Sequence, residues 1–260
     1  MAKLSSLSVS KVKHVLIFGP PKCGKTYLAG LLAKHKKLLW FDLEGGHSTL
    51  FQFSAELQDN IELVAIPDNR GTPMAIETML KVIKGGKVTI CERHGKVTCP
   101  VCTKDSLPIT TVELNALDND WAVVVDSATQ LTNSAIAHIT KLQAVDYKLD
   151  YDDWAHLGKL MDTFFSYVQT ASFNVVCISH ELAVKMVDGT EKLVPVGGTS
   201  NFSRNTAKYF DEVIYGRIVN GQYTFTSNGA AENKILVGSR ANIDMKKDKQ
   251  AELIDLWGAR

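Results

Sequence analysis

The sequence lacks a long apolar run, and no hydrophobic stretch approaches the roughly eighteen residues that suggest a membrane-spanning helix. The first apolar run, at residues 15–18, is also too short for the core of a signal peptide. Cysteine is scarce and unevenly placed, with three of the five inside positions 91–102. This distribution argues against a disulfide framework and indicates a reducing compartment. We therefore expect a cytoplasmic protein with no membrane partner.

A strong excess of either charge is also missing. The chain has 29 Lys and Arg against 28 Asp and Glu, which leaves a net charge of +1. Without a global field, a nucleic acid could be bound only by a local basic patch. The 260 residues are enough for one large core without cross-links, so we treat residues 1–260 as a single domain with an insertion at 85–110.

Short apolar segments of strand length alternate with helical patterns along most of the chain. We expect strands at 14–18, 38–43, 61–66, 121–126 and 174–179, with helices at 25–35, 73–83 and 154–171. Several of these strands are continuously apolar, as in a parallel sheet buried on both faces. Towards the C-terminus we expect antiparallel strands at 212–219, 222–227 and 234–239, turns at 220–221 and 227–229, and a helix at 247–257. The sequence thus predicts an α/β fold with a mainly parallel sheet and C-terminal antiparallel strands.

The segment "GPPKCGKT" carries the pattern G-x4-G-K-[ST] between the first strand and the first helix. Glycines let successive backbone N–H groups point at phosphate oxygens, and the helix N-terminus adds partial positive charge. Pro20 and Pro21 have no N–H, so the donors should begin at Lys22. We expect Lys25 to reach the β- and γ-phosphates of ATP and Cys23 to fill space rather than react. The residues expected to contact the nucleotide are Gly19, Lys22, Cys23, Gly24, Lys25, Thr26 and Tyr27, together with Asp126.

Two carboxylates and a histidine follow predicted strands and suggest the rest of a catalytic site. Asp126 ends an apolar strand and could hold Mg²⁺ together with Thr26, although an aspartate there could also simply cap a helix. Ser127 follows it where many ATPases have glutamate, so the base must come from elsewhere. Glu44 is our candidate, because alternation along a strand would place it beside Asp42 at the ligand-binding edge. His180 follows another strand and could sense the γ-phosphate; a solvated Glu44 and a turn-capping His180 are the plainer alternatives.

The segment "CERHGKVTCPVC" holds a second set of chemically distinctive residues. Cys91, His94, Cys99 and Cys102 form C-x2-H-x4-C-x2-C, the spacing of a closed Cys₃His zinc site. We expect 87–90 to pair with 96–98 as a short hairpin, and zinc to fold an insertion that has little apolar content. A redox pair Cys99–Cys102 is the main rival, but it would not need Cys91 and His94. With four ligands filled, the ion would be structural rather than catalytic.

In this order, the motifs resemble the RecA-type recombinase core. The similarity is greatest to the short bacteriophage ATPases of the RecA-like, single-strand-annealing recombinase type. It rests on the phosphate loop, "FDLEGGHSTL", "IPDNRGTPMAIETML", "VVVDS", "CISHEL" and "VGGTSNFSRNTAKYFDEVIYGRI", and covers roughly residues 12–240. The resemblance implies a RecA-like P-loop core that uses ATP and Mg²⁺, with Lys25, Glu44 and His180 in catalysis. It also implies DNA recombination on single-stranded DNA, assembly as a filament or ring, and action inside the host cell. A single-strand-binding or replication protein is a further partner to consider.

The resemblance further implies two DNA-facing loops, near 141–154 and 183–200. Lys185 and Lys192 lie in the second, and Arg204 and Lys208 follow it, which suits contacts with phosphates. The first loop contains four aspartates and departs from this pattern. Lys234 and Arg240 lie in the late region from which such proteins complete a neighbour's ATP site.

Other nucleotide-binding classes fit less well. A nucleotide kinase with a zinc-bearing lid should carry the lid late and supply arginines, whereas this cysteine cluster precedes the Asp126 strand and contains only Arg93. A GTPase should carry an N-K-x-D or T-K-x-D segment, which is absent. An ATP-dependent switch or loader that binds a replication protein remains an open alternative.

Overall fold

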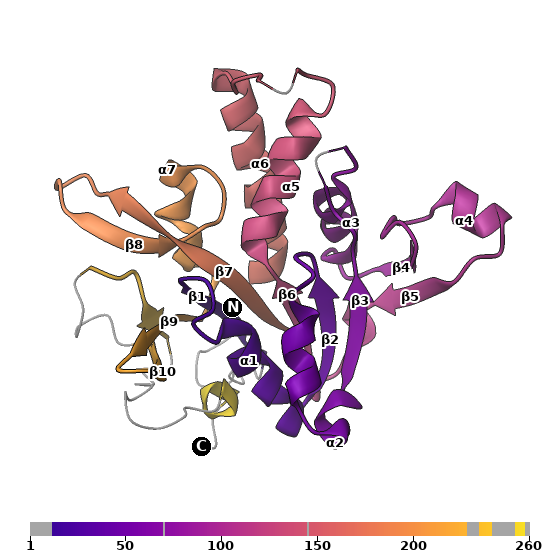
Figure 1. Ribbon diagram of the computed structural model, residues 1–260, viewed down its shortest axis with the longest axis horizontal. Helices are drawn as coiled ribbons and strands as arrows, with labels where there is room; N and C mark the ends of the chain where they lie inside the picture. Colours follow the sequence, from indigo (N-terminus) through magenta and orange to yellow (C-terminus); the bar gives the residue numbers. More distant parts are fainter. Residues whose placement is uncertain (1–11, 70, 145, 228–233, 241–252, 258–260) are drawn as a thin grey trace, which may run out of the picture.

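The computed structural model describes residues 12–69, 71–144, 146–227, 234–240 and 253–257, which form an α/β fold around one large sheet (Figure 1). The strand order is β10, β9, β1, β7, β6, β2, β3. Neighbouring strands from β9 to β3 are parallel, and β10 lies antiparallel to β9. The mainly parallel α/β fold with added antiparallel strands is therefore confirmed. The strands are β1 (His14–Gly19), β2 (Lys37–Asp42), β3 (Ile61–Ala65), β6 (Trp121–Asp126), β7 (Asn174–Lys185), β9 (Glu212–Val219) and β10 (Gln222–Thr226).

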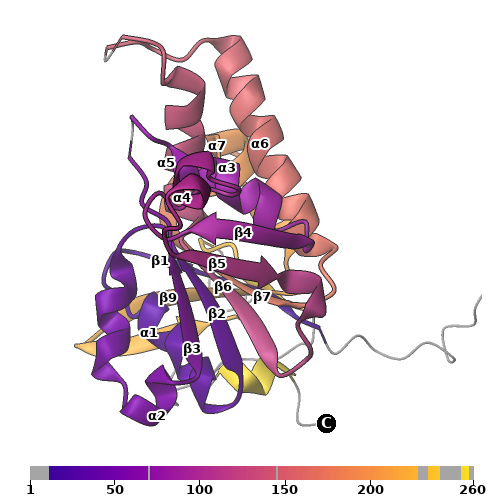
Figure 2. The ribbon, with the colours of Figure 1, turned by 90° about the vertical axis from the view of Figure 1, so that its right-hand side faces the viewer.

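Helices cover both faces of this sheet, as the continuously apolar strands predict. Along β1, Leu16 and Phe18 belong to the core beneath α3, α5 and α6, whereas Val15 and Ile17 belong to the core beneath α1 (Figure 2). The first layer contains α3 (Met74–Val82), α5 (Ala128–Thr140) and α6 (Tyr151–Gln169). The second contains α1 (Lys25–Gly30), α2 (Ala55–Gln58) and the 3₁₀ helices η2 (Leu31–Lys34) and η3 (Gly46–Gln52). Within the described residues, no helix has both the length and the apolar character to cross a membrane.

The C-terminal strands differ from the expectation in their pairing, and only 238–239 of the predicted strand 234–239 forms a strand. β9 was predicted to be antiparallel, but it also joins the parallel sheet, with Val15 opposite Glu212. It is antiparallel only to β10 and to the short strand β11 (Gly238–Ser239). The turn at Asn220 and Gly221 is confirmed, with positive φ at both residues. Residues 228–229 of the second predicted turn and 247–252 of the last predicted helix lie outside the described residues; 253–257 form a 3₁₀ helix.

The predicted DNA-facing loop at 183–200 is also partly regular structure. β7 continues to Lys185, and β8 (Glu191–Pro195) pairs with it antiparallel. These two segments, 181–195, form a ribbon that extends away from α5 and α6 (Figure 1). A short helix, α7 (Ser200–Ser203), and the 3₁₀ helix η5 (Thr206–Tyr209) follow it.

The segment around the cysteine cluster is a separate antiparallel hairpin. β4 (Lys87–Cys91) pairs with β5 (Ile109–Glu113), and α4 (Pro100–Lys104) lies between them. The predicted pairing of 87–90 with 96–98 is present beside this ladder as an antiparallel bridge between Ile90 and Val97. Thr98 N donates to Thr89 O at 2.9 Å, and Cys91 N donates to Lys96 O at 3.1 Å. Two apolar residues of the 85–110 segment, Ile90 and Val97, are buried in the core beneath α3, together with Val112 and Leu114 just beyond it.

The turn of this hairpin packs tightly on the end of β3. Gly95 has φ +61°, and a Cβ on it would lie 2.8 Å from Ile66 Cγ2 and 3.0 Å from Ile66 Cα. Its carbonyl accepts a hydrogen bond of 2.6 Å from Thr78 Oγ1 on α3. The backbone at Gly95 is therefore fixed by both conformation and close contact.

We predict that Gly95→Ala lowers the free energy of unfolding by about 1–3 kcal/mol, because the added methyl group meets backbone. Gly86→Ala is the matched control, since its Cβ would enter open space, and it should change stability by less than about 0.5 kcal/mol. Urea denaturation of both variants measures the difference. Equal stabilities would contradict the packing described here.

Candidate functional site

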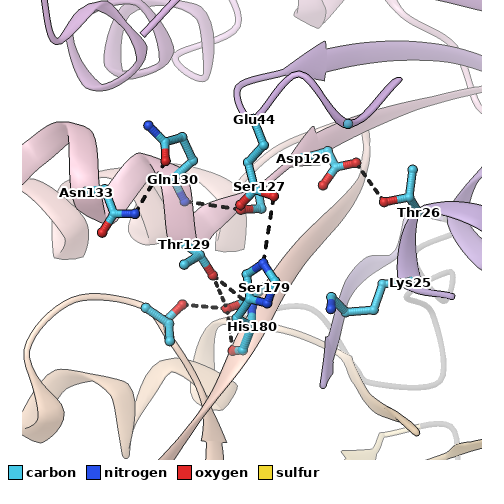
Figure 3. Close-up of polar contacts among 12 residues, drawn as sticks. Lys25, Thr26, Glu44, Asp126, Ser127, Thr129, Gln130, Asn133, Ser179 and His180 are labelled. Carbon is cyan, nitrogen blue, oxygen red and sulfur yellow. Dashed lines mark hydrogen bonds and ion pairs between the residues drawn. The ribbon is translucent and has the colours of Figure 1, made fainter. Parts of the chain in front are cut away.

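The residues predicted to handle a nucleotide meet at the carboxyl edge of the sheet. β1 and β7 run side by side so that Gly19 lies opposite His180, and β2 and β6 place Asp42 opposite Asp126. The phosphate loop opens α1 beside them. One edge therefore gathers Lys25, Thr26, Glu44, Asp126 and His180, which Figure 3 shows together.

The phosphate loop has the backbone that its sequence predicts. Lys22 and Gly24 have positive φ values of 63° and 87°. Gly19 allows no other residue, because a Cβ there would lie 2.1 Å from the carbonyl oxygen of Gly216. Such a loop can aim consecutive N–H groups at one anion.

Lys25 is folded into this loop. Its Nζ donates to the carbonyl oxygens of Gly19 at 3.1 Å and Pro20 at 2.7 Å. Burial lowers the pKa of Lys25, although the charges of Cys23 and Asp126 oppose this shift. A phosphate would offer the ammonium group a stronger partner than two carbonyl oxygens.

Packing fixes the positions of Cys23 and Tyr27, two further residues expected to contact the nucleotide. Cys23 is buried, and burial raises the pKa of its thiol, which suits the predicted space-filling role better than reactivity. Tyr27 stacks on Phe53 with ring centroids 5.0 Å apart, and 39% of the residue is exposed.

Thr26 and Asp126 offer adjacent oxygen atoms. Thr26 Oγ1 donates to Asp126 Oδ2 at 3.0 Å. Burial, and next the nearby charge of Glu44, raise the pKa of Asp126 to about 7. A divalent cation favours the ionised carboxylate, and a hydroxyl beside a carboxylate suits Mg²⁺. These two side chains could therefore hold Mg²⁺, as predicted.

Glu44 is held by two side chains. Its Oε1 accepts a hydrogen bond from Ser127 Oγ, and its Oε2 lies 3.8 Å from His180 Nε2 (Figure 3). Burial alone would raise the pKa of Glu44, but the hydrogen bonds from His180 and Ser127 outweigh it and lower the pKa. Glu44 is therefore an ionised, oriented carboxylate at 30% side-chain exposure, able to accept a proton from water.

Glu44 and Asp42 do not share a strand face, contrary to the prediction. β2 ends at Asp42, so strand alternation does not reach Glu44. Asp42 is buried, and its Oδ1 accepts from the N–H groups of Glu44 at 3.2 Å, Gly45 at 2.9 Å and Gly46 at 3.1 Å. Asp42 thus shapes the turn that presents Glu44, and does not share its role.

Sequence reasoning missed the hydroxyl groups that organise this edge. Ser127 was regarded only as the absence of a glutamate, yet it donates to Glu44 and caps α5 by accepting from Gln130 N at 3.1 Å. Thr129 Oγ1 accepts from His180 N at 2.8 Å. The segment "SATQ" has the S-x-x-Q spacing of a helix N-terminus, so the cap could have been found.

The four predicted zinc ligands converge on the hairpin. One ligand atom from each of Cys91, His94, Cys99 and Cys102 lies within 4.8 Å of all the others. His94 Nδ1 is 3.8 Å from Cys91 Sγ, 3.6 Å from Cys99 Sγ and 3.2 Å from Cys102 Sγ. Tetrahedral zinc–ligand bonds of about 2.0–2.3 Å require ligand separations of about 3.5 Å, so the cluster fits such an ion. The backbone N–H of Cys102 lowers the pKa of Cys99 to about 6, which favours the thiolate that a metal needs.

The predicted DNA-contacting residues do not form one group. Lys185 lies on the ribbon, and Arg204 donates to the Lys185 carbonyl. Lys192 lies on the other strand of the ribbon, opposite Val184. Lys208 lies over the ring of Tyr209, 4.7 Å from its centroid, and its carbonyl faces Arg240.

Lys234 and Arg240, which were predicted to act on a neighbouring ATP site, lie in different parts of the structure. Lys234 is exposed, and its carbonyl accepts from Leu193 N in the ribbon at 2.7 Å. Arg240 pairs with Asp211 at 3.0 Å, at the amino edge of the sheet. Arg240 thus lies at the opposite edge of the sheet from the phosphate loop of its own chain.

The family assignment agrees with this geometry. Residues 11–234 match the family described as "AAA domain". The chain belongs to this family. This AAA-domain protein is therefore a nucleotide-binding P-loop ATPase. A search of curated proteins gave no match.

We predict that Lys25→Ala weakens ATP binding by about 100-fold, because the phosphates lose their main charged partner. Glu44→Gln should bind ATP normally but hydrolyse it about 10²–10⁴-fold more slowly, because an amide cannot accept the proton of water. Isothermal titration and phosphate release measure the two effects. Glu62→Gln, exposed on β3, is the matched control, and normal turnover by Glu44→Gln would exclude Glu44 as the base.

We predict about one zinc ion per chain by elemental analysis of protein purified without chelators, because the four ligands form a closed site. Cys99→Ser should make residues 85–110 more sensitive to proteolysis and leave ATP affinity unchanged. Val101→Ala, exposed on α4, is a control in the same segment that leaves the four ligands intact. Absence of metal, or loss of ATP affinity in Cys99→Ser, would overturn the structural role of the ion.

Proposed function

We propose that this AAA-domain ATPase acts on single-stranded DNA in recombination, as the RecA-like order of its motifs implies. The observation that carries the proposal is the continuity of β7. This strand places His180 beside Glu44 and then runs unbroken to Lys185 in the ribbon. One element thus joins the nucleotide site to a projecting ribbon that carries Lys185 and Lys192.

In the proposed reaction, Lys25 and the phosphate loop hold the nucleotide phosphates. Thr26 and Asp126 hold Mg²⁺, which supplies charge neutralisation when bound. Glu44 accepts the proton of the attacking water while Ser127 keeps its carboxylate in place. His180 lies on β7 with its side chain beside Glu44, so it is placed to respond when the γ-phosphate is lost.

The base of the ribbon is tied to this site by three hydrogen bonds. Ser179 Oγ donates to Val196 O at 2.7 Å, and Val196 N donates to His180 O at 2.9 Å. Thr129 links the same point to α5 through the N–H of His180. A shift at His180 would therefore reach the ribbon through a stiff connection, which supports DNA binding that depends on nucleotide state.

Self-assembly as a filament or ring forms part of this proposal. Lys234 and Arg240 are exposed cations, and Arg240 lies at the opposite edge of the sheet from its own phosphate loop. Such a residue could act only on the ATP site of another copy. We infer that the protein acts inside its host cell, where ATP and Mg²⁺ are available.

A second candidate function is an ATP-dependent switch that binds a replication protein. The acidic segment before and within the start of α6 favours it. Asp150 and Asp153 form the capping box of α6, and Asp153 also accepts from Tyr147 at 2.6 Å. This surface suits a protein partner better than the phosphates of DNA.

We predict sequence-tolerant binding of single-stranded DNA that strengthens with ATP and weakens with salt. The double variant Lys185→Ala/Lys192→Ala should reduce the slope of log affinity against log salt by about 1.4, or about 0.7 per lost phosphate contact. Lys159→Ala, exposed on α6, should change it little. Fluorescence anisotropy with a labelled oligonucleotide measures this. No binding at low salt with ATP present would leave the protein-binding switch as the better account.

A further inference from the structure

Asp68 lies outside the nucleotide site, where the chain after β3 meets α3 and α5. It follows β3, and its carboxylate joins two helices, α3 and α5. Oδ1 accepts from Ala75 N at the start of α3 at 3.1 Å and from Ser134 Oγ on α5 at 3.0 Å. Oδ2 accepts from Gln130 Nε2 on α5 at 2.9 Å.

From Asp68, a short path leads to the proposed catalytic base. Gln130 lies in the first turn of α5, and its N–H donates to Ser127 Oγ at 3.1 Å. The same hydroxyl donates to Glu44 Oε1 (Figure 3). Because Gln130 is tied to Asp68 by its side chain and to Ser127 by its backbone, a movement of Asp68 shifts the N-terminus of α5 and the hydroxyl that orients Glu44.

In the other direction, Asp68 is braced by the Cys₃His hairpin. Gly95, which directly follows His94, packs against Ile66 and Pro67 just before Asp68. Thr78 ties Gly95 to α3, whose first turn is also bound by Asp68. The turn that carries Asp68 is thus held between the metal-ligand loop and α5.

We propose that Asp68 and Gln130 are positioning residues that connect the Cys₃His cluster to Glu44, so that a folded cluster maintains the rate of ATP hydrolysis. This inference rests on the proposed role of Glu44 but not on DNA binding. The cluster adds no group to the reaction, and its influence passes through the orientation of one carboxylate. It therefore affects turnover and not ATP affinity.

A double-mutant cycle on DNA-free ATP hydrolysis tests this connection. Cys99→Ser loosens the cluster, and Gln130→Met removes the amide that holds Asp68 while keeping the side-chain length. Each variant should lower kcat about tenfold or more, because small misplacements of a catalytic group are costly. Each should leave the ATP dissociation constant within about twofold. The double variant should be no slower than the slower single variant, because both changes break one path.

Asn133→Ala is the matched control on α5. Asn133 Nδ2 donates to Gln130 Oε1 at 3.3 Å. Among the described residues, Asn133 makes no hydrogen bond with Asp68 or Ser127, so turnover should stay near that of the unchanged protein. Amide hydrogen exchange adds a readout other than activity. Cys99→Ser should increase exchange at residues 66–76 and leave residues 19–30 protected.

Several results would overturn the proposal. Normal kcat in Gln130→Met would show that Asp68 does not act through this side chain. If the two single losses multiplied, so that kcat fell about 100-fold in the double variant, the two substitutions would act independently. Unchanged exchange at 66–76 in Cys99→Ser would show that the hairpin does not brace Asp68. Absence of hydrolysis by the unchanged protein both with and without single-stranded DNA would remove the ATPase itself, whereas absence of DNA binding would leave this proposal intact.

Discussion

The hydrogen bond from Ser127 to Glu44 is the contact on which the candidate site depends. It exists because β2 and β6 end at the same level, with Asp42 opposite Asp126. Different structures follow the two strands. After β2, Asp42 accepts hydrogen bonds from the backbone N–H groups of a turn. After β6, Ser127 caps the N-terminus of α5. The turn positions the Glu44 carboxylate, and the cap residue Ser127 positions the hydroxyl that donates to it. Thr26 meets the same strand end from the phosphate loop.

This arrangement explains why the site needs a buried parallel sheet. A parallel sheet aligns the carboxyl ends of distant segments at one edge, and helices on both faces keep the strands in register. The edge can then hold an ionised Glu44 near a lysine and a buried Asp126 whose pKa is raised. The opposite edge carries the ion pair between Arg240 and Asp211, so the two edges of the sheet present different charged groups.

Much of this could be predicted from residues alone. The phosphate loop, the apolar strands and the Cys₃His spacing are local patterns, and each predicts its own structure. The parallel partner of β9 could not be found in this way, because strand pairing between distant segments leaves no local signal. The helix α5 was missed because its Thr, Ser and Asn content lowers helix propensity, while its cap and tertiary packing stabilise it. Asp42 and Glu44 were expected to share a strand face, but β2 ends at Asp42. The exact residue at which a strand ends is not evident from the sequence.

The role of Glu44 is tested most directly by a structure of the protein with Mg²⁺, ADP and aluminium fluoride, which imitates the phosphoryl group in transfer. We expect Lys25 Nζ to leave the carbonyl oxygens of Gly19 and Pro20 and contact the fluoride. Glu44 should accept a hydrogen bond from the in-line water while still accepting one from Ser127. A water held by another side chain, with Glu44 turned towards solvent, would contradict the account.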